Sequence, residues 1–239
     1  MSVKDATPIL SVRLRRSCSQ GVVILETSGA PPSFIGANAK DRAIKMPPHA
    51  MNGINTWLVD MNAGDTVGNK VVLAMILGAM IAFDMGGPVN KVAFFFASGL
   101  IAQGNISMMG PVAAAICTPP LGMGLATLLG RKLWTDEQRE SGYAAMGMGM
   151  IGITEGAIPF AASDPLRVIP CIMLGSMVAS TTAMLARVGN GAPHGGPIVL
   201  PVVTNPVMYI VAIIAGTVVT ALAINTVKSL SKKPDQAAA

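Results

Sequence analysis

Two long stretches of this sequence, residues 92–130 and 188–227, contain no Asp, Glu, Lys or Arg. A soluble domain seldom runs so far without a charge, because its exposed faces need solvation. Over the whole chain only 12% of residues are charged while 51% are hydrophobic, against about 25% charged in average globular domains. Lipid is the simplest solvent for such a chain, so the sequence predicts an integral membrane protein in contact with membrane lipid.

The composition also excludes several other classes of protein. Intrinsic disorder needs high charge and low hydrophobicity, and a net charge of +5 without a dense basic face argues against nucleic-acid binding. Three scattered cysteines (Cys18, Cys117 and Cys171) do not form a disulfide scaffold, and with two distant histidines they give no metal-ligand spacing. No Gly-rich stretch continues into the Gly-Lys-Ser/Thr of a nucleotide site. We therefore predict neither a metal nor a cofactor.

Five apolar segments are candidates for helices that cross or enter a bilayer, which takes about 20 apolar residues for a full span. They are residues 71–83 with their flanks, 92–103, 110–130, 168–186 and 207–227. Residues 131–140 are predicted to be a polar loop between two of them. We expect an all-α polytopic membrane fold of about five to seven hydrophobic helices, including broken or re-entrant hairpins.

The ends of the chain differ from its apolar middle. Residues 1–50 combine a basic cluster with two proline pairs, and we assign them to an atypical, poorly ordered extension. Residues 51–228 are predicted to be the membrane domain and residues 229–239 a tail. Lysines follow the last apolar segment at positions 228, 232 and 233, which favours a cytoplasmic tail by the positive-inside rule.

Clusters of glycine and proline interrupt the apolar segments at residues 86–88, 110–111, 119–120, 159 and 195–197. Proline removes a backbone donor, and freed backbone groups are tolerated in lipid only inside protein or beside a wet cavity. Transporters use such broken helices to surround a substrate near the bilayer midplane. The alternative is that glycine and proline serve close helix packing and kinks.

Ionisable residues beside these clusters are the candidate functional groups, because a charge at the bilayer centre costs at least about 2.5 kcal/mol. Asp84 and Lys91 flank the first cluster, where a structural ion pair is the alternative to a functional role. Asp164 and Arg167 fit an interfacial pair or a helix cap ahead of a proline, so we expect them to be structural or gating residues, as Asp84 is.

Glu155 is the strongest candidate for substrate binding. It follows an uncharged run and precedes an apolar one, and glycines at 152 and 156 are expected to leave space for a ligand. His194 lies among glycines, a setting in which a histidine is more often structural than functional.

Three longer motifs occur in this order: FDMGGPVNKVAFFFASGL at residues 83–100, GITEGAIPFAASDPLRVIP at 152–170 and APHGG at 192–196. They resemble the membrane (IIC) component of fructose-family sugar phosphotransferase permeases. The resemblance covers roughly residues 51–228 and corresponds to about the C-terminal half of a full IIC domain. The earlier helices of that domain are not recognisable in residues 1–50.

This resemblance implies a sugar permease subunit of a phosphoenolpyruvate-dependent phosphotransferase system in the bacterial inner membrane. Such a subunit binds a fructose-like sugar and translocates it for phosphorylation by a separate cytoplasmic IIB component. A IIA component is the other expected partner. Related IIC proteins are homodimers, and in that fold a glutamate on a re-entrant hairpin binds sugar hydroxyls. The matching residue is Glu155, with Thr154, Asn90, Lys91 and His194 as companions.

The phosphoryl-carrying parts of the system are not recognisable in this sequence. None of the three cysteines lies at the head of a phosphate-binding loop, and the Pro-His-Gly around His194 is surrounded by a long uncharged stretch. We therefore expect no catalytic residue in this chain. Two alternatives stay open: an ion-coupled transporter that uses Asp84, Lys91 and Glu155 as a relay, and a IIC remnant without transport activity.

Overall fold

The computed structural model describes residues 12–13, 26–27, 53, 56–58, 60 and 67–236. The chain divides into two compact units, Met1–Lys45 and Met46–Ala239. In the first unit the described residues form a short antiparallel pair, β1 (Val12–Arg13) with β2 (Glu26–Thr27). The rest of the extension predicted at residues 1–50 lies outside the described residues.

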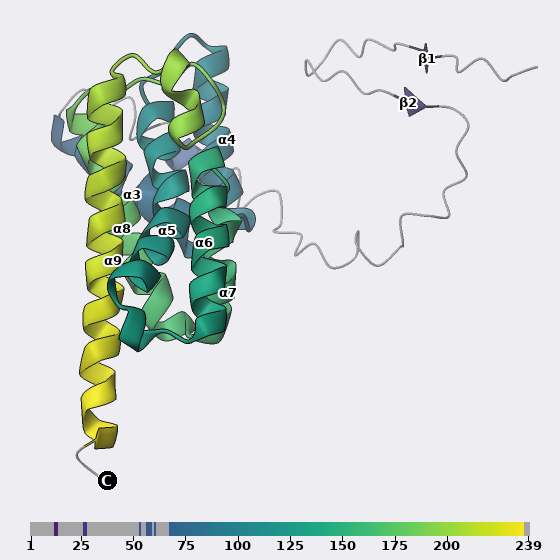
Figure 1. The fold of residues 1–239 in the computed structure, drawn as a ribbon. Coiled ribbons are helices and arrows are strands. Elements are labelled where there is room, and N and C mark those ends of the chain that lie inside the picture. The colour runs from purple at the N-terminus through teal and green to yellow at the C-terminus, as the bar shows by residue number, and fades with distance from the viewer. Residues whose placement is uncertain are drawn as a thin grey trace, which may run out of the picture. The chain divides into compact units, whose positions relative to one another are not determined.

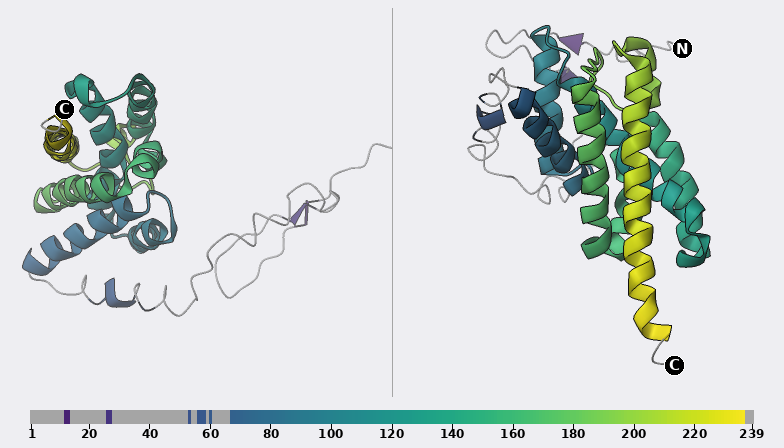
Figure 2. Two further views of the ribbon diagram at one scale, coloured as in Figure 1. Left: turned by 90° about the horizontal axis from the view of Figure 1, so that it is seen from below. Right: turned by 90° about the vertical axis from the view of Figure 1, so that its left-hand side faces the viewer.

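The second unit is a helical bundle over its described residues (Figure 1), which confirms the predicted all-α membrane fold. Its elements are α3 (Val67–Phe83), α4 (Pro88–Ala102), α5 (Met109–Leu129), η1 (Arg131–Leu133), α6 (Asp136–Ile151), η2 (Thr154–Ala157), α7 (Ile158–Ser163), α8 (Pro165–Leu185), η3 (Pro197–Val202) and α9 (Pro206–Gln236). Helix α9 extends beyond the other helices at its C-terminal end in both side views (Figures 1 and 2).

Three of these helices, α5, α8 and α9, are long and apolar enough to cross a bilayer, the last of them over Pro206–Leu230. Helices α3 and α4 are apolar but shorter. All five predicted apolar segments therefore fall on helices. Helix α9 also exposes a row of apolar side chains, among them Val207, Val211, Ile214, Val218 and Leu222. Such a surface is suited to lipid, and the chain is a membrane protein.

Helices α3 and α8 run antiparallel in close contact. The Ser180 hydroxyl donates a hydrogen bond to the Ala74 carbonyl (2.7 Å), and one turn further along α3 a Cβ at Gly78 would lie 2.6 Å from the Ser176 carbonyl oxygen. A small residue at such a point lets two backbones approach, which is how helices associate in lipid.

Helix α5 runs unbroken through two of the predicted interruptions, residues 110–111 and 119–120, so these two predictions are wrong. Pro111 lies in the first turn, where a missing N–H costs no hydrogen bond. Pro119 cannot bond the Ala115 carbonyl, but the Ser176 hydroxyl of α8 donates to that oxygen (3.4 Å). A neighbouring helix thus satisfies the group that the proline frees.

The predicted polar loop at residues 131–140 is a loop only in its first part, because α6 begins at Asp136. Thr135 and Gln138 form a capping box, in which each backbone N–H donates to the other residue's side chain (both 3.3 Å). Helix α6 was not predicted from the sequence because its first turn is charged and its last turns are rich in glycine and methionine.

Trp134 anchors the connection between α5 and α6 to the end of α9. Its indole Nε1 donates to Asn225 Oδ1 (3.0 Å), and Asn225 Nδ2 donates to the Ala126 carbonyl (3.0 Å). The Lys228 ammonium lies 3.4 Å from the centre of the indole ring, a cation–π contact. The charged connection and the lysine at the end of the α9 span therefore lie at the same end of the bundle.

Replacing Asn225 with leucine is expected to lower the free energy of unfolding by about 1–2 kcal/mol, because the buried indole N–H loses its acceptor. Thermal unfolding of the purified protein in detergent measures this. The control is Thr226→Ala, which removes an exposed hydroxyl bonded only to its own helix. Equal destabilisation by both variants would contradict the proposed anchor.

Candidate functional site

Helices α3 and α4 form a hairpin whose turn, residues 84–87, is closed by two polar side chains. The Asp84 carboxylate accepts hydrogen bonds from the backbone N–H groups of Val89 (2.7 Å) and Asn90 (2.9 Å). The Asn90 amide in turn donates to the Ile81 carbonyl near the end of α3 (2.7 Å). Asp84 thus caps the N-terminus of α4, where a negative charge is also favoured by the helix dipole.

Lys91 follows Asn90 in the first turn of α4, with its side chain exposed. It forms no ion pair with any residue in the described part of the chain, so the Asp84–Lys91 pair considered from the sequence does not form. Lys91 remains a charged group beside the turn, while both oxygens of Asp84 accept backbone hydrogen bonds.

Replacing Asp84 with alanine is expected to lower the free energy of unfolding by about 1–2 kcal/mol, since α4 loses its cap. Asp84→Asn should cost less than half of that, because the amide oxygen still accepts a hydrogen bond. Thermal unfolding of the two variants beside the parent tests the assignment. If the asparagine variant were the less stable of the two, Asp84 would not act as a cap.

Helix α6 with η2 and α7 forms a second hairpin, which enters and leaves the bundle at one end. Trp134, just before α6, and Phe160 in α7 meet edge-to-face with their ring centres 5.7 Å apart. Between them the chain reverses at Gly152, whose φ of +86° lies in the left-handed region that favours glycine. The N–H of Gly152 bonds the Gly149 carbonyl (3.1 Å), and that of Ile153 bonds the Met148 carbonyl (2.9 Å), which closes the end of α6. The structure therefore has a helical hairpin here whose two ends lie at the same end of the bundle.

The loop between α8 and α9 reaches the tip of this second hairpin. His194 Nε2 donates a hydrogen bond to the Ile151 carbonyl (2.6 Å). A Cβ at Gly152 would lie 2.1 Å from the Gly195 carbonyl oxygen, and one at Gly196 would lie 2.7 Å from the Gly152 nitrogen. The two backbones are in direct contact, which only glycine permits at these positions.

Glu155 makes a contact between the tip of the second hairpin and the turn of the first. A Cβ at Gly86 would lie 2.6 Å from Glu155 Oε1, so the carboxylate lies against the backbone of the α3–α4 turn. A Cβ at Gly156 would meet Pro120 at 3.0 Å, and one at Gly195 would meet Ile116 at 2.7 Å. The two tips and the α8–α9 loop therefore meet beside the middle of the spanning helix α5.

Comparisons with known proteins identify the family. The chain is 53% identical over 182 residues to the fructose-like permease IIC component 2 of Escherichia coli strain K12, a match that covers 76% of this chain and 50% of that protein. It is 50% identical over 222 residues to the PTS system fructose-specific EIIB'BC component of Rhodobacter capsulatus, covering 92% of this chain and 35% of that one. This chain is a homologue of the IIC components of fructose-family sugar phosphotransferase permeases.

A third relative of this IIC homologue is the PTS system fructose-specific EIIC component of Haloferax volcanii, 42% identical over 221 residues, with 92% of this chain and 54% of that protein covered. The chain thus spans about half the length of the IIC proteins it matches. The matches that cover 92% of the chain also extend into residues 1–50, assigned above to an atypical extension. No family model and no solved structure matches the chain.

Four of the predicted substrate-binding residues of the IIC homologue lie at the two tips, and the fifth, His194, lies in the α8–α9 loop. Glu155 and His194 are exposed, and Thr154 is buried with a hydroxyl that forms no hydrogen bond within the described residues. Asn90 is buried at the facing turn, and Lys91 follows it on α4. The arrangement places the Glu155 carboxylate and the His194 imidazole beside the glycine backbone of the tips and the loop, with the Thr154 hydroxyl next to Glu155 in the chain. These are the groups that hydrogen-bond a polyol.

The other two predicted residues of the IIC homologue belong to a different place. Asp164 and Arg167 form an ion pair (3.0 Å) at the start of α8, and the Asp164 carbonyl accepts the Val168 N–H (3.0 Å). The pair joins residues three apart on one helix. This geometry is that of a helix-end pair.

The role of the glycines was not predicted from the sequence. The prediction that Gly152 and Gly156 leave space for a ligand is wrong, because backbone of the α8–α9 loop fills the space at Gly152 and Pro120 lies at Gly156. Gly86 and Gly195 were predicted only as helix breaks. The sequence feature that could have indicated these close backbone contacts is the Gly-Gly-Pro triplet, which occurs both at residues 86–88 and at 195–197.

Proposed function

We propose that the chain is a sugar permease subunit of a phosphoenolpyruvate-dependent phosphotransferase system. It binds a fructose-like sugar at the two hairpin tips and moves it across the bacterial inner membrane as a multi-pass protein. The observation that carries this proposal is the Glu155 carboxylate against Gly86, at the middle of a bundle of spanning helices. The relatives named as fructose-specific components supply the class of sugar.

Glu155 is the primary sugar ligand in this proposal. Each carboxylate oxygen accepts hydroxyl hydrogen bonds, and bonds to a charged acceptor are about twice as strong as neutral ones. The Thr154 hydroxyl, the Asn90 amide and the Lys91 ammonium complete the site. His194 hydrogen-bonds the sugar through Nδ1, because its Nε2 already bonds the Ile151 carbonyl.

The phosphoryl group comes from other components. Relatives of this chain carry names that combine the C component with A or B components, such as the fructose-specific EIIABC component of Bacillus subtilis. Both cysteines within the described residues, Cys117 and Cys171, are buried in spanning helices and out of reach of a phosphoryl donor. We propose that separate IIA and IIB proteins act at the end of the bundle that carries Lys228, and that the permease is a homodimer.

Uptake of labelled fructose by cells that lack their own fructose permease tests the proposal. With the phosphocarriers and IIB present, the chain should restore uptake, and the sugar should accumulate as its phosphate. Uptake that persists without the phosphocarriers and collapses with the ion gradient would favour the ion-coupled alternative. If cells show no uptake and the purified protein does not bind fructose, the chain is a IIC remnant without transport activity.

A further inference from the structure

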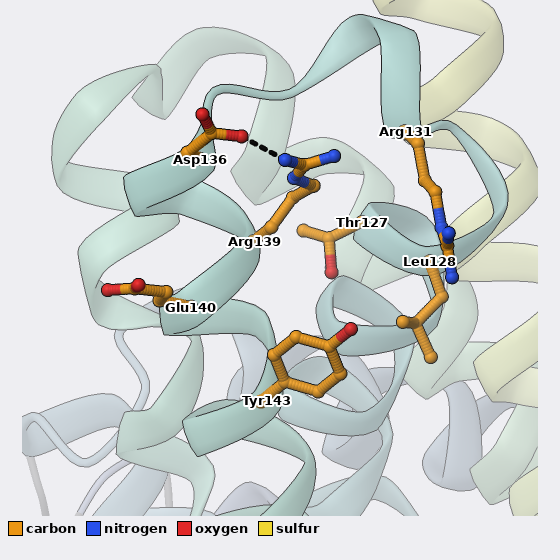
Figure 3. A pocket seen from close by; sticks show the side chains of 7 residues that line it. All are labelled: Thr127, Leu128, Arg131, Asp136, Arg139, Glu140 and Tyr143. Atoms are coloured by element: carbon orange, nitrogen blue, oxygen red, sulfur yellow. Dashed lines mark hydrogen bonds and ion pairs between the residues drawn. The ribbon is translucent and has the colours of Figure 1, made fainter.

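A polar cavity of about 530 Å³ lies between the C-terminal end of α5 and the first turns of α6, far from the hairpin tips (Figure 3). It is lined by Thr127, Leu128, Arg131, Asp136, Arg139, Glu140 and Tyr143, and Figure 3 shows the Glu140 carboxylate pointing away from the two guanidinium groups. These residues belong to the end of the bundle where Trp134 and Lys228 meet. The cavity is therefore at the level where a membrane protein meets the headgroups of the lipid.

The polar groups of this cavity suit a phosphate. Arg139 pairs with Asp136, whereas Arg131 forms no ion pair with the described residues. Figure 3 shows the guanidinium groups of Arg131 and Arg139 on two sides of one space, with the Tyr143 hydroxyl beside it. Guanidinium groups bind phosphate through paired N–H donors, and a guanidinium with five donors can serve a carboxylate and a phosphate together.

A second hollow, an apolar groove of about 270 Å³, lies nearer the middle of the bundle. Helices α5, α6 and α9 all line it, with Leu125, Met146, Met150, Ile214 and Val218 among its residues.

On both α5 and α6, the residues that line the groove and those that line the cavity lie on the same face of the helix. On α5, residues 121, 125 and 128 are spaced by four and three, and on α6 residues 143, 146 and 150 are spaced by three and four. Such spacing puts side chains on one side of a helix. From Leu129, where α5 ends, to residue 121 the helix rises about 12 Å, so the groove lies deeper along the helix than the cavity.

We propose that one anionic phospholipid binds along α5 and α6, with its phosphate between Arg131 and Arg139 and one acyl chain in the groove beside α9. A phosphate and an apolar tail joined in one molecule match the polar cavity and the groove in their order along the helices. A soluble phosphate would leave the groove unused. This inference rests on the membrane location of the chain and does not depend on sugar transport.

Native mass spectrometry of the full chain in detergent, titrated with phosphatidylglycerol, tests the proposal. Arg131→Gln and Arg139→Gln should each weaken binding of this lipid about fivefold, the value of one basic residue near an anionic lipid surface. Lys132→Gln is the matched control, because it removes the same charge from a neighbouring residue that does not line the cavity. An equal effect of Lys132→Gln, or no effect of the arginine variants, would overturn the phosphate assignment.

The acyl chain is tested separately with Met150→Trp, which fills the groove and leaves the arginines in place. This variant should also weaken lipid binding, whereas Leu222→Trp on the exposed face of α9 should not. Competition by sn-glycerol 3-phosphate as strong as that by the lipid would overturn the proposal in favour of a free phosphate. Loss of lipid binding on formation of a dimer that covers the groove would overturn it in favour of a second copy. Glu155→Gln should leave lipid binding unchanged, so failure here is distinct from failure of the sugar site.

Discussion

Replacing Glu155 with glutamine is expected to weaken binding of fructose to the purified protein about 30- to 100-fold, with the protein still folded and inserted. The amide keeps one acceptor and loses the negative charge, and a hydrogen bond to a charged group contributes about 2–3 kcal/mol. Titration of the detergent-solubilised protein with fructose measures the change. Uptake by cells should fall with it, because the same contact serves translocation.

Glu137→Gln provides the matched control for this experiment. Glu137 is an exposed glutamate in the first turn of the same helix hairpin, at the end opposite to the tip. The substitution removes the same charge without touching the site, so fructose binding should stay within twofold of the parent. If the Glu155 variant also bound fructose like the parent, the sugar site would have to lie elsewhere.

The second large effect is expected at Gly152, where alanine should lower the free energy of unfolding by about 2–4 kcal/mol. Part of this cost comes from forcing a residue with a side chain into the left-handed region. The rest comes from a Cβ placed 2.1 Å from the Gly195 carbonyl oxygen, a backbone atom that can move only with its loop. Because the tip must shift, fructose binding should be lost together with stability.

Gly147 offers a control on the same helix. A Cβ there meets nothing within 4 Å, and the residue lies inside α6, so Gly147→Ala should raise stability by about 0.5–1 kcal/mol through helix propensity. Thermal unfolding of the two variants under identical conditions gives the comparison. Equal behaviour of the two would show that the hairpin tip is not tightly packed against the α8–α9 loop.

Hydropathy predicted the membrane fold because lipid-facing segments must be apolar along their whole length. The predicted segments 110–130 and 168–186 match α5 and α8 within three residues at each end, and 207–227 matches the apolar part of α9, Pro206–Leu230, equally closely. Helix α6 could not be predicted from hydropathy, since its first turn is charged and the residues that it buries are small, namely Gly142, Ala145 and Gly149. The path of α5 through Pro119 also could not be predicted, because the donor that compensates it, Ser176, lies in another helix.

The residues of the candidate site were easier to predict than their roles. A charge in an apolar segment is conspicuous, so Asp84, Lys91 and Glu155 all stood out. Their roles depend on contacts between segments far apart in sequence. Asp84 and Glu155 are both carboxylates beside glycines in apolar segments. Asp84 nevertheless accepts hydrogen bonds from two N–H groups of its own hairpin, whereas Glu155 contacts Gly86 in the other hairpin. The spacing of residues along the chain contains no information about that difference.

The contact between the second hairpin and the α8–α9 loop has a consequence for motion. At Gly152 and Gly196 backbone meets backbone, with no interlocked side chains, and His194 adds a hydrogen bond to the Ile151 carbonyl. The loop itself is tied to α5 and α9, through the Gly196 N–H to Ala113 and the Tyr209 hydroxyl to Gly196. Separating the hairpin from the loop would therefore break this one hydrogen bond, which is worth about 1 kcal/mol, and would expose the close backbone contact. If the chain moves sugar as proposed, we expect the hairpin tip and the loop to slide past each other at this contact, because no side chains have to repack there.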